Sequence, residues 1–184
     1  ESVDGSAAAA TFVVEDGTIV AGANSYATVE FGDTYSSDYG APAAWTSSTT
    51  AQKEEALRMG TRDIDALFEE RFVGMRSDED QELAWPRLYV YDRNGFAIAS
   101  DAVPTAVKQA TVLAAIARRR GDVVVPETQS SGDIASESVD VGEISKSVTY
   151  LGGKPQAAVL SMAERILRQR GLIEGGGGWG YASR

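Results

Sequence analysis

Carboxylates, lysine, tyrosine and serine are the side chains left to do chemistry in this chain, because it contains neither histidine nor cysteine. Histidine has the unperturbed pKa best suited to proton transfer near neutral pH, and it is the commonest ligand of transition metals. Cysteine would have supplied thiolate nucleophiles, zinc ligands and disulfides. We therefore expect the protein not to be an enzyme and to carry no cofactor.

One group of carboxylates at helical spacing is Asp63, Asp65, Glu69 and Glu70. Asp65 and Glu69 are four residues apart, so they would share one face of a helix, as paired metal ligands can. Three arginines lie near enough in the sequence to form surface ion pairs with these acids: Arg58, Arg62 and Arg71. We therefore favour a solvated, ion-paired helix face over a metal site.

Three further motifs have a functional and a structural interpretation. The glycine run 175–180 lacks the preceding strand, following helix and lysine of a phosphate-binding loop. The stretch from Asp92 to Gly95 is a turn signal and lacks the later acidic ligand of a calcium loop. The cluster Arg118–Arg120 could touch DNA, but cations at a helix end are more typical of dipole compensation.

The charge of the chain is negative and uneven. Residues 1–101 carry 19 acidic and 7 basic side chains, residues 102–184 carry 8 and 10, and the net charge is -10. Nucleic acid is attracted by clustered cations, so a chain with a pI of about 4.5 is a poor match for it. The apolar stretches fall far short of the roughly 20 residues that span a bilayer, so we expect no membrane partner.

Apolar periodicity predicts four helices, at about 29–39, 49–68, 104–120 and 155–170. In the first helix Phe31, Tyr35 and Tyr39 would lie on one face. The second has an apolar stripe that runs from Leu57 to Phe68, and the third has one from Val107 to Ala117. The helix ends carry typical capping residues, namely Thr28, the capping box Thr49-x-x-Gln52, Pro104, Gly121, Pro155 and Gly171.

Two segments are not helical in pattern. Residues 73–103 hold an acidic run, a Trp85-Pro86 corner and a turn at 92–95 flanked by apolar residues, which predicts a small hairpin or loop. After a Ser/Gly/Glu-rich stretch at 126–138, strands 139–141 and 144–150 are expected to pair around a two-residue turn at 142–143. A lone hairpin is marginally stable, so it should pack on the helices or on a neighbouring subunit.

The predicted fold class is mainly α: a small four-helix bundle with an inserted β-hairpin at about 136–151. Residues 1–24 are expected to form an extended N-terminal arm, residues 25–171 the helical domain, and residues 172–184 a flexible C-terminal tail. The tail places Trp179 and Tyr181 beyond a run of four glycines. Ordering glycines costs unusually much backbone entropy, so these aromatic side chains are better suited to gripping another molecule than to completing their own core.

The succession of motifs resembles a tailed-phage family of DnaT-like single-stranded-DNA-binding proteins, which is similar to the head-tail adaptor, or head-completion, proteins. The resemblance covers most of the chain, from about Phe12 to Arg184. Its most specific piece is Leu-Ala-Trp-Pro-Arg at 83–87. The other pieces are Val14-Glu-Asp-Gly17, Ala23-Asn-Ser-Tyr26, Lys53-x-x-Ala56-Leu57-Arg58, Asp92-x-x-Gly95, Val103-Pro104 and the glycine-rich end with a terminal arginine.

This resemblance implies a virion protein of the neck, at the head-tail interface, made in the host cytoplasm. Its copies would form a ring, typically a dodecamer, beneath the portal protein, and genomic DNA would pass through the lumen without specific binding. The next neck protein, a stopper or tail-completion protein, would dock below. Residues expected in the portal-binding tail are Leu172, Ile173, Trp179, Tyr181 and Arg184.

A subunit interface is expected at the Trp85 corner and on the hairpin, although a tryptophan buried within its own chain is an equal alternative for Trp85. The interface residues would be Trp85, Pro86, Arg87, Ile144, Val148 and Tyr150. The alternative function is a single-stranded-DNA-binding replication protein, in which Tyr89, Tyr91 and Phe96 would stack on bases. That alternative lacks the cationic groove such proteins use. A hydrolase built on carboxylates is a third class, but no spacing in the chain specifies one.

Overall fold

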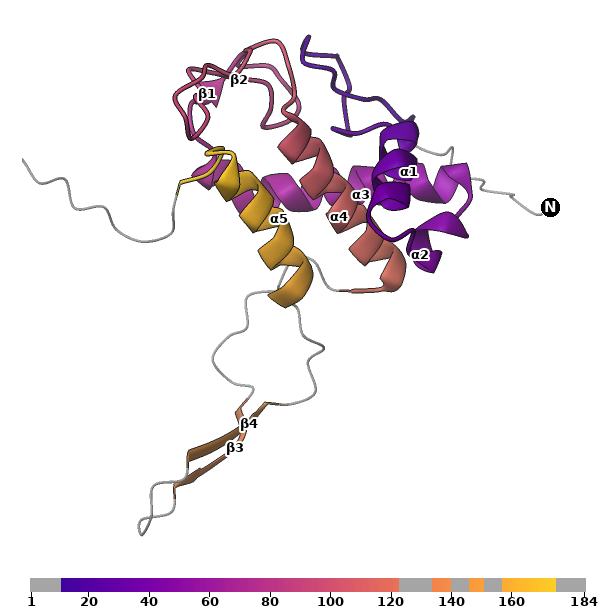
Figure 1. The fold of residues 1–184 in the computed structure, drawn as a ribbon, viewed down its shortest axis with the longest axis vertical. Helices are drawn as coiled ribbons and strands as arrows, with labels where there is room; N and C mark the ends of the chain where they lie inside the picture. The colour runs from indigo at the N-terminus through magenta and orange to yellow at the C-terminus, as the bar shows by residue number, and fades with distance from the viewer. Residues whose placement is uncertain (1–10, 123–133, 140–145, 151–156, 175–184) are drawn as a thin grey trace, which may run out of the picture.

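The structure is a computed structural model that describes residues 11–122, 134–139, 146–150 and 157–174. This part of the chain is mainly helical, with five α-helices, a 3-10 turn and two short antiparallel sheets (Figure 1). The helices are α1 (Val29–Asp38), α2 (Ala43–Thr46), α3 (Thr50–Phe68), η1 (Glu69–Arg71), α4 (Thr105–Arg120) and α5 (Ala157–Gln169). Strand β1 (Met75–Arg76) pairs with β2 (Arg87–Leu88), and β3 (Ile134–Val139) pairs with β4 (Lys146–Tyr150).

The predicted capping residues Thr28, Thr49 and Gly121 are confirmed, while Pro155 lies outside the described residues. The Thr28 hydroxyl accepts the Phe31 N–H at 3.1 Å, and Thr49 and Gln52 form a reciprocal capping box. Gly121 ends α4 in the left-handed region, with φ of 77°. The structure adds one helix that the sequence did not predict, the single turn α2 inside the connector 40–50.

Helix α4 is the centre of the body, because α1, α2, α3 and α5 all pack against it. Its contact with α3 is very close at Gly60, where a Cβ would lie 2.7 Å from the Thr111 carbonyl oxygen and 2.9 Å from the Ala115 nitrogen. The sequence predicted one apolar stripe on α4. In the structure the buried residues of α4 also include Val112, Ala115 and Ile116, because other helices cover α4 on several sides.

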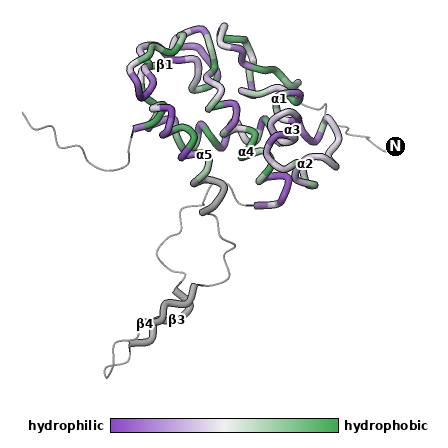
Figure 2. The backbone as a smooth tube through the Cα atoms, in the orientation of Figure 1, coloured by the Kyte–Doolittle hydropathy of each residue, from purple (hydrophilic) through white to green (hydrophobic). Residues whose placement is uncertain are grey.

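The core consists of two clusters. One lies among the ends of α3 and α5, the start of α4 and the loops between α3 and α4, and includes Phe68, Trp85 and Leu167. The other joins α2 to the middle of α3 and α4 around Trp45, Leu57 and Val112. Hydrophobic and hydrophilic stretches alternate along the helices and loops (Figure 2), and no described helix is both long and apolar enough to cross a membrane.

The segment before α1 is docked on the body over its described residues, 11–24. The Glu15 carboxylate is buried and accepts backbone N–H groups from Gly17, Ile19 and Val20 at 2.8–3.0 Å. Gly17 lies so close to the backbone of Asp101 that a Cβ there would be 2.1 Å from its carbonyl oxygen. The segment therefore covers the chain just before α4.

The β3–β4 hairpin stands apart from the helical body (Figure 1). Val139 lies opposite Lys146, the register that a two-residue turn at 142–143 would set, although residues 140–145 are outside the described part. The first strand begins at Ile134, five residues before the predicted start, because cross-strand pairing extends into a stretch whose composition suggested a loop. Packing on a neighbouring subunit stays a prediction for this hairpin.

Replacing Gly60 with alanine tests the close crossing of α3 and α4. Alanine raises helix propensity by about 1 kcal/mol, but its methyl group would collide with the α4 backbone, so we expect a net loss of about 1–3 kcal/mol in the free energy of unfolding. Urea titration measures the change, with Ala66→Ser on the exposed side of α3 as the control. A stabilised Gly60→Ala protein would contradict the crossing described here.

Candidate functional site

The Leu83–Arg87 motif is a buried corner of this chain. Trp85, Pro86 and Arg87 are all buried, and the Trp85 ring meets Phe72 edge to face with centroids 5.5 Å apart. The sequence assigned these three residues to a possible subunit contact. The structure agrees with the alternative weighed for Trp85, a tryptophan buried within its own chain, because its side chain is fully buried in the core of a single copy and Pro86 and Arg87 are buried beside it.

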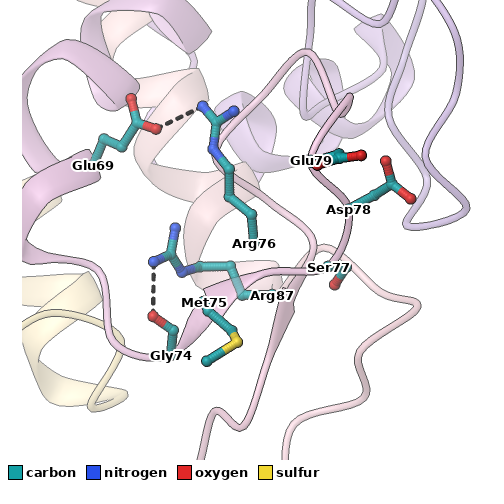
Figure 3. A pocket seen from close by; sticks show the side chains of 8 residues that line it. All are labelled: Glu69, Gly74, Met75, Arg76, Ser77, Asp78, Glu79 and Arg87. Atoms are coloured by element: carbon teal, nitrogen blue, oxygen red, sulfur yellow. Dashed lines mark hydrogen bonds and ion pairs between the residues drawn. The ribbon is translucent and has the colours of Figure 1, made fainter.

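Arg87 holds the loop that follows α3. Its guanidinium donates hydrogen bonds to four backbone carbonyls, those of Phe72, Val73, Gly74 and Ala84, at 2.9–3.3 Å. Figure 3 shows the bond to Gly74. A buried carbonyl without a partner is costly, and this segment has only a two-residue ladder to satisfy its own groups. Arg87 therefore supplies hydrogen-bond donors to backbone carbonyls that a longer sheet would otherwise have satisfied.

Asp65 holds the other side of the corner. Its carboxylate accepts hydrogen bonds from the Tyr26 hydroxyl at 2.6 Å and from the Ala84 backbone N–H at 3.1 Å. The Tyr26 hydroxyl oxygen in turn accepts the backbone N–H of Trp85 at 3.1 Å. Burial raises the pKa of Asp65 to about 6, against the partial opposition of these hydrogen bonds. Burial also raises the pKa of Tyr26 well above its ordinary value.

The four carboxylates from Asp63 to Glu70 are therefore only partly the solvated face that the sequence predicted, because Asp63 is buried and Asp65 is partly buried, whereas Glu70 is exposed. Asp63 is buried and pairs with Arg118 of α4 at 2.5 Å, and Glu69 pairs with Arg76 of β1 at 2.6 Å. The ion pairs come from residues distant in sequence, which helical spacing alone could not reveal. Among the described residues, no three acidic side chains gather as ligands for a metal ion.

The basic end of α4 is likewise joined to the body. Arg118 binds Asp63, and the Arg119 Nε donates to the Ser48 hydroxyl at 2.8 Å. These tertiary partners add to the helix-dipole role that the sequence indicated for the cluster. The side chain of Arg120 is exposed.

A small hairpin at residues 89–98, here called the aromatic hairpin, projects from this corner. Two backbone hydrogen bonds join its strands: the Asp92 N–H donates to the Phe96 carbonyl at 2.8 Å, and the Ile98 N–H donates to the Val90 carbonyl at 2.9 Å. This pairing confirms the predicted hairpin. The Asp92 carboxylate accepts the N–H groups of Asn94 and Phe96, so it is a turn residue. Val90 is buried and anchors the hairpin to the core.

The aromatic hairpin directs its aromatic side chains outward. Tyr89, Tyr91 and Phe96 are 72%, 55% and 71% exposed. Tyr89 adopts φ of 58°, a left-handed conformation that is uncommon outside glycine, asparagine and aspartate. Strained and exposed aromatic residues on a firmly anchored loop are typical of an interaction surface.

An open hollow of about 600 Å³ lies between η1 and the loops around β1 and β2 (Figure 3). Two cations line it, but Arg76 is paired with Glu69 and Arg87 is committed to backbone carbonyls. The remaining charged side chains on its wall are Asp78 and Glu79. This arrangement does not provide an anion site or a cationic groove for nucleic acid.

The first residues of the predicted tail belong to the core. Leu172 is fully buried and Ile173 is 5% exposed. Ile173 bridges Phe72, the Leu172 carbonyl accepts the Val73 N–H at 3.0 Å, and the Glu174 N–H donates to the Arg71 carbonyl at 2.8 Å. Leu172 and Ile173 therefore anchor the end of α5, and we remove both from the set of partner-binding residues.

The other predicted contact residues are outside what the structure describes. Trp179, Tyr181, Arg184 and Ile144 lie in undescribed segments, and Val148 and Tyr150 lie in β4, where only the backbone is described. The exposed aromatic hairpin and the fixed point at Glu174 are the two candidate functional features that we take forward from the described surface. The sequence analysis had singled out the hairpin aromatics only for the alternative function.

A mainly helical domain with an inserted hairpin is thus the class of protein that this fold defines. Residues 10–183 match the model of the family described as "Putative DnaT-like ssDNA binding protein". The chain belongs to this family. No curated protein and no solved structure matches it.

Arg76 of β1 and Arg87 of β2 lie opposite each other, which makes them a matched pair for mutation. Arg87→Met would leave buried carbonyls without donors, so we expect the free energy of unfolding to fall by about 2–4 kcal/mol. Arg76→Met removes an exposed ion pair and one long hydrogen bond to the Gln81 carbonyl, and should cost about 1 kcal/mol. Chemical unfolding of both variants measures the difference, and equal losses would contradict the role given to Arg87.

Asp65 should make stability depend on pH. Its pKa in the folded protein is raised, so the native state holds this proton more tightly, and the Asp65 contribution is largest below about pH 4 and is lost as pH rises through about 6. Asp65→Asn does not titrate, so its stability relative to wild type should rise by about 2 kcal/mol from pH 4 to pH 8. Urea unfolding across that range measures it.

Asp80→Asn, on the exposed acidic loop, is the matched control for Asp65→Asn. It should show a stability difference from wild type that changes little over the same pH range. A pH-independent difference for Asp65→Asn would count against the buried carboxylate.

Proposed function

We propose that this protein is a structural head-tail adaptor of a tailed bacteriophage, which forms a ring under the portal and inserts its C-terminal residues into it. The observation that carries the proposal is the anchored exit of the C-terminal segment. Leu172 and Ile173 are fixed in the core beside Phe72, and Glu174 is exposed. The ten residues that follow, with Trp179 and Tyr181 beyond the glycine run, start from a fixed point on the surface.

The length and composition of residues 175–184 suit a distant contact. Ten extended residues reach on the order of 35 Å, enough to enter a neighbouring ring. Burial of Trp179 and Tyr181 would contribute about 10 kcal/mol, while ordering the segment costs at least about 10 kcal/mol. One such contact is marginal. A ring presents several at once, and the high effective concentration makes the whole assembly bind tightly.

The charge of the described surface supports passage of DNA without retention. The described residues before α3 include five acids and no base, and the acidic loop 78–82 is exposed except for Gln81. Such surfaces repel phosphate. In this proposal genomic DNA passes through the lumen of the ring in the virion neck, and a stopper or tail-completion protein docks on its far side.

A second candidate is a single-stranded-DNA-binding protein, as the family description suggests. The three outward aromatic side chains of the aromatic hairpin favour it, because bases stack on such residues. The charges of the hollow beside the hairpin oppose it, since Arg76 and Arg87 are engaged there and the other charged side chains are acidic. Arg93 is the exposed cation on the hairpin itself. We therefore rank it below the adaptor.

Deleting residues 175–184 tests the adaptor proposal. The truncation keeps Leu172 and Ile173, so we expect wild-type stability by thermal unfolding but loss of co-sedimentation with purified portal rings. The double variant Trp179→Ala/Tyr181→Ala should lose most of the binding as well. Retained binding by the truncated protein would rule out the proposed contact.

The same preparations separate the two candidates. A salt-dependent shift of a labelled single-stranded oligonucleotide at micromolar protein, abolished by Tyr91→Ser and Phe96→Ser, would support the DNA-binding function. No shift, together with portal binding through the C-terminal residues, would support the adaptor.

A further inference from the structure

A second concave surface, here called the bundle hollow, lies between α1, α4 and α5 and has a volume of about 180 Å³. Its walls include Tyr39, Ile116 and Met162, and Arg120 is the charged residue that lines it. Tyr39 is 69% exposed and Met162 is 47% exposed. Four of the seven large apolar side chains exposed on the described surface belong to the β1 and aromatic-hairpin loops, and two more border this hollow.

The bundle hollow contains an unsatisfied polar group. The Ser36 hydroxyl is buried in its wall and has no hydrogen-bond partner among the described residues. A buried hydroxyl without a partner costs free energy that an incoming donor or acceptor would recover. The wall therefore favours an occupant that is apolar and also carries a hydrogen-bonding group, which describes a tyrosine side chain.

The aromatic hairpin and the bundle hollow lie toward opposite ends of α5. Gly171, just after the helix, is so close to the hairpin that a Cβ would be 3.0 Å from the Arg93 nitrogen. Met162, near the start of the helix, borders the hollow. Figure 1 shows the loops around β1 and β2 at one end of α5 and its first turns at the other. One copy of the chain thus presents a convex aromatic surface at one end and a concave one toward the other.

The two ends also differ in charge. Residues 69–101, which include the aromatic hairpin, carry 8 acidic and 4 basic side chains. The residues that line the bundle hollow include one charged side chain, the exposed and basic Arg120. Opposite charge favours contact between unlike ends and disfavours contact between like ends.

We propose that the aromatic hairpin of one copy docks in the bundle hollow of the next copy. Tyr89 or Tyr91 would bring a hydroxyl to Ser36, Phe96 would cover Met162, and the Arg120 guanidinium would lie over an aromatic face. The contact joins unlike surfaces, so it repeats from copy to copy and closes into a ring when the rotation allows. It specifies how the ring of the proposed function is built, yet it requires no portal and is testable on the protein alone.

Paired cysteines test the contact directly, because the natural chain has none. The double variant Tyr39→Cys/Phe96→Cys, at high protein concentration with a short bismaleimide, should give a ladder of covalent multimers on a denaturing gel. Both positions are exposed, so neither substitution removes a core side chain. The control Ala66→Cys/Phe96→Cys, with its second cysteine on the exposed side of α3, should give no ladder.

Other occupants give different results. Covalent dimers from Phe96→Cys alone would mean that hairpin meets hairpin, and this would overturn the proposal. A ladder that forms only after residues 175–184 are deleted would mean that this segment occupies the bundle hollow in the full chain, and this would overturn the proposal. Absence of any ladder would also overturn the proposal, whether or not the protein binds portals, so its failure is distinct from failure of the adaptor function.

Sedimentation equilibrium supplies an independent measurement. Phe96→Ser and Met162→Ser should each weaken self-association at least about tenfold, because aromatic and apolar residues at the centre of a contact carry most of its affinity. Met75→Ser removes an exposed apolar side chain from β1, outside the proposed contact, and should leave self-association nearly unchanged. Unchanged association in the first two variants would overturn the proposal.

Discussion

Buried backbone groups that lack secondary structure are the constraint on which the loops between α3 and α4 depend. Residues 73–103 contain only the two-residue pairing of β1 with β2 and the bridge in the aromatic hairpin. Three side chains do most of the rest. Buried Arg87 donates to four carbonyls, buried Gln81 donates to those of Leu83 and Pro86, and partly buried Asp65 accepts the Ala84 N–H and the Tyr26 hydroxyl. Without them, irregular backbone could not be packed against the helices.

The Leu83–Arg87 motif is therefore a structural motif whose effect on function is indirect. Trp85 fills the core, and Arg87 ties together the chain that leaves α3. The same corner fixes both candidate functional features, because the aromatic hairpin extends from it and Ile173 bridges Phe72 beside it. A partner would contact the aromatic hairpin or the residues after Ile173, which the corner positions, rather than the motif itself.

Burial and ion pairing divide the acidic residues into those that stabilise the body and those that charge its surface. Asp63 and Asp65 contribute to stability inside the body, whereas the acidic loop and α1 determine how the surface meets other molecules. The cations are similarly divided, with Arg118 and Arg119 engaged in the body and Arg120 exposed. This division agrees with the proposal that the partners are proteins, including further copies of the chain.

The sequence by itself determined the four principal helices, their caps at Thr28 and Thr49, the hairpin around Asp92 and the register of the second hairpin. Capping, turn formation and apolar periodicity depend on residues close together in the sequence, so they can be predicted from the sequence alone. Only the tertiary structure decided that Trp85 and Arg87 are internal, that Asp63 pairs with Arg118, that Leu172 and Ile173 are core, and that Ser36 faces a hollow. Each of these depends on a partner tens of residues away or on which faces are covered, and no local pattern encodes that proximity.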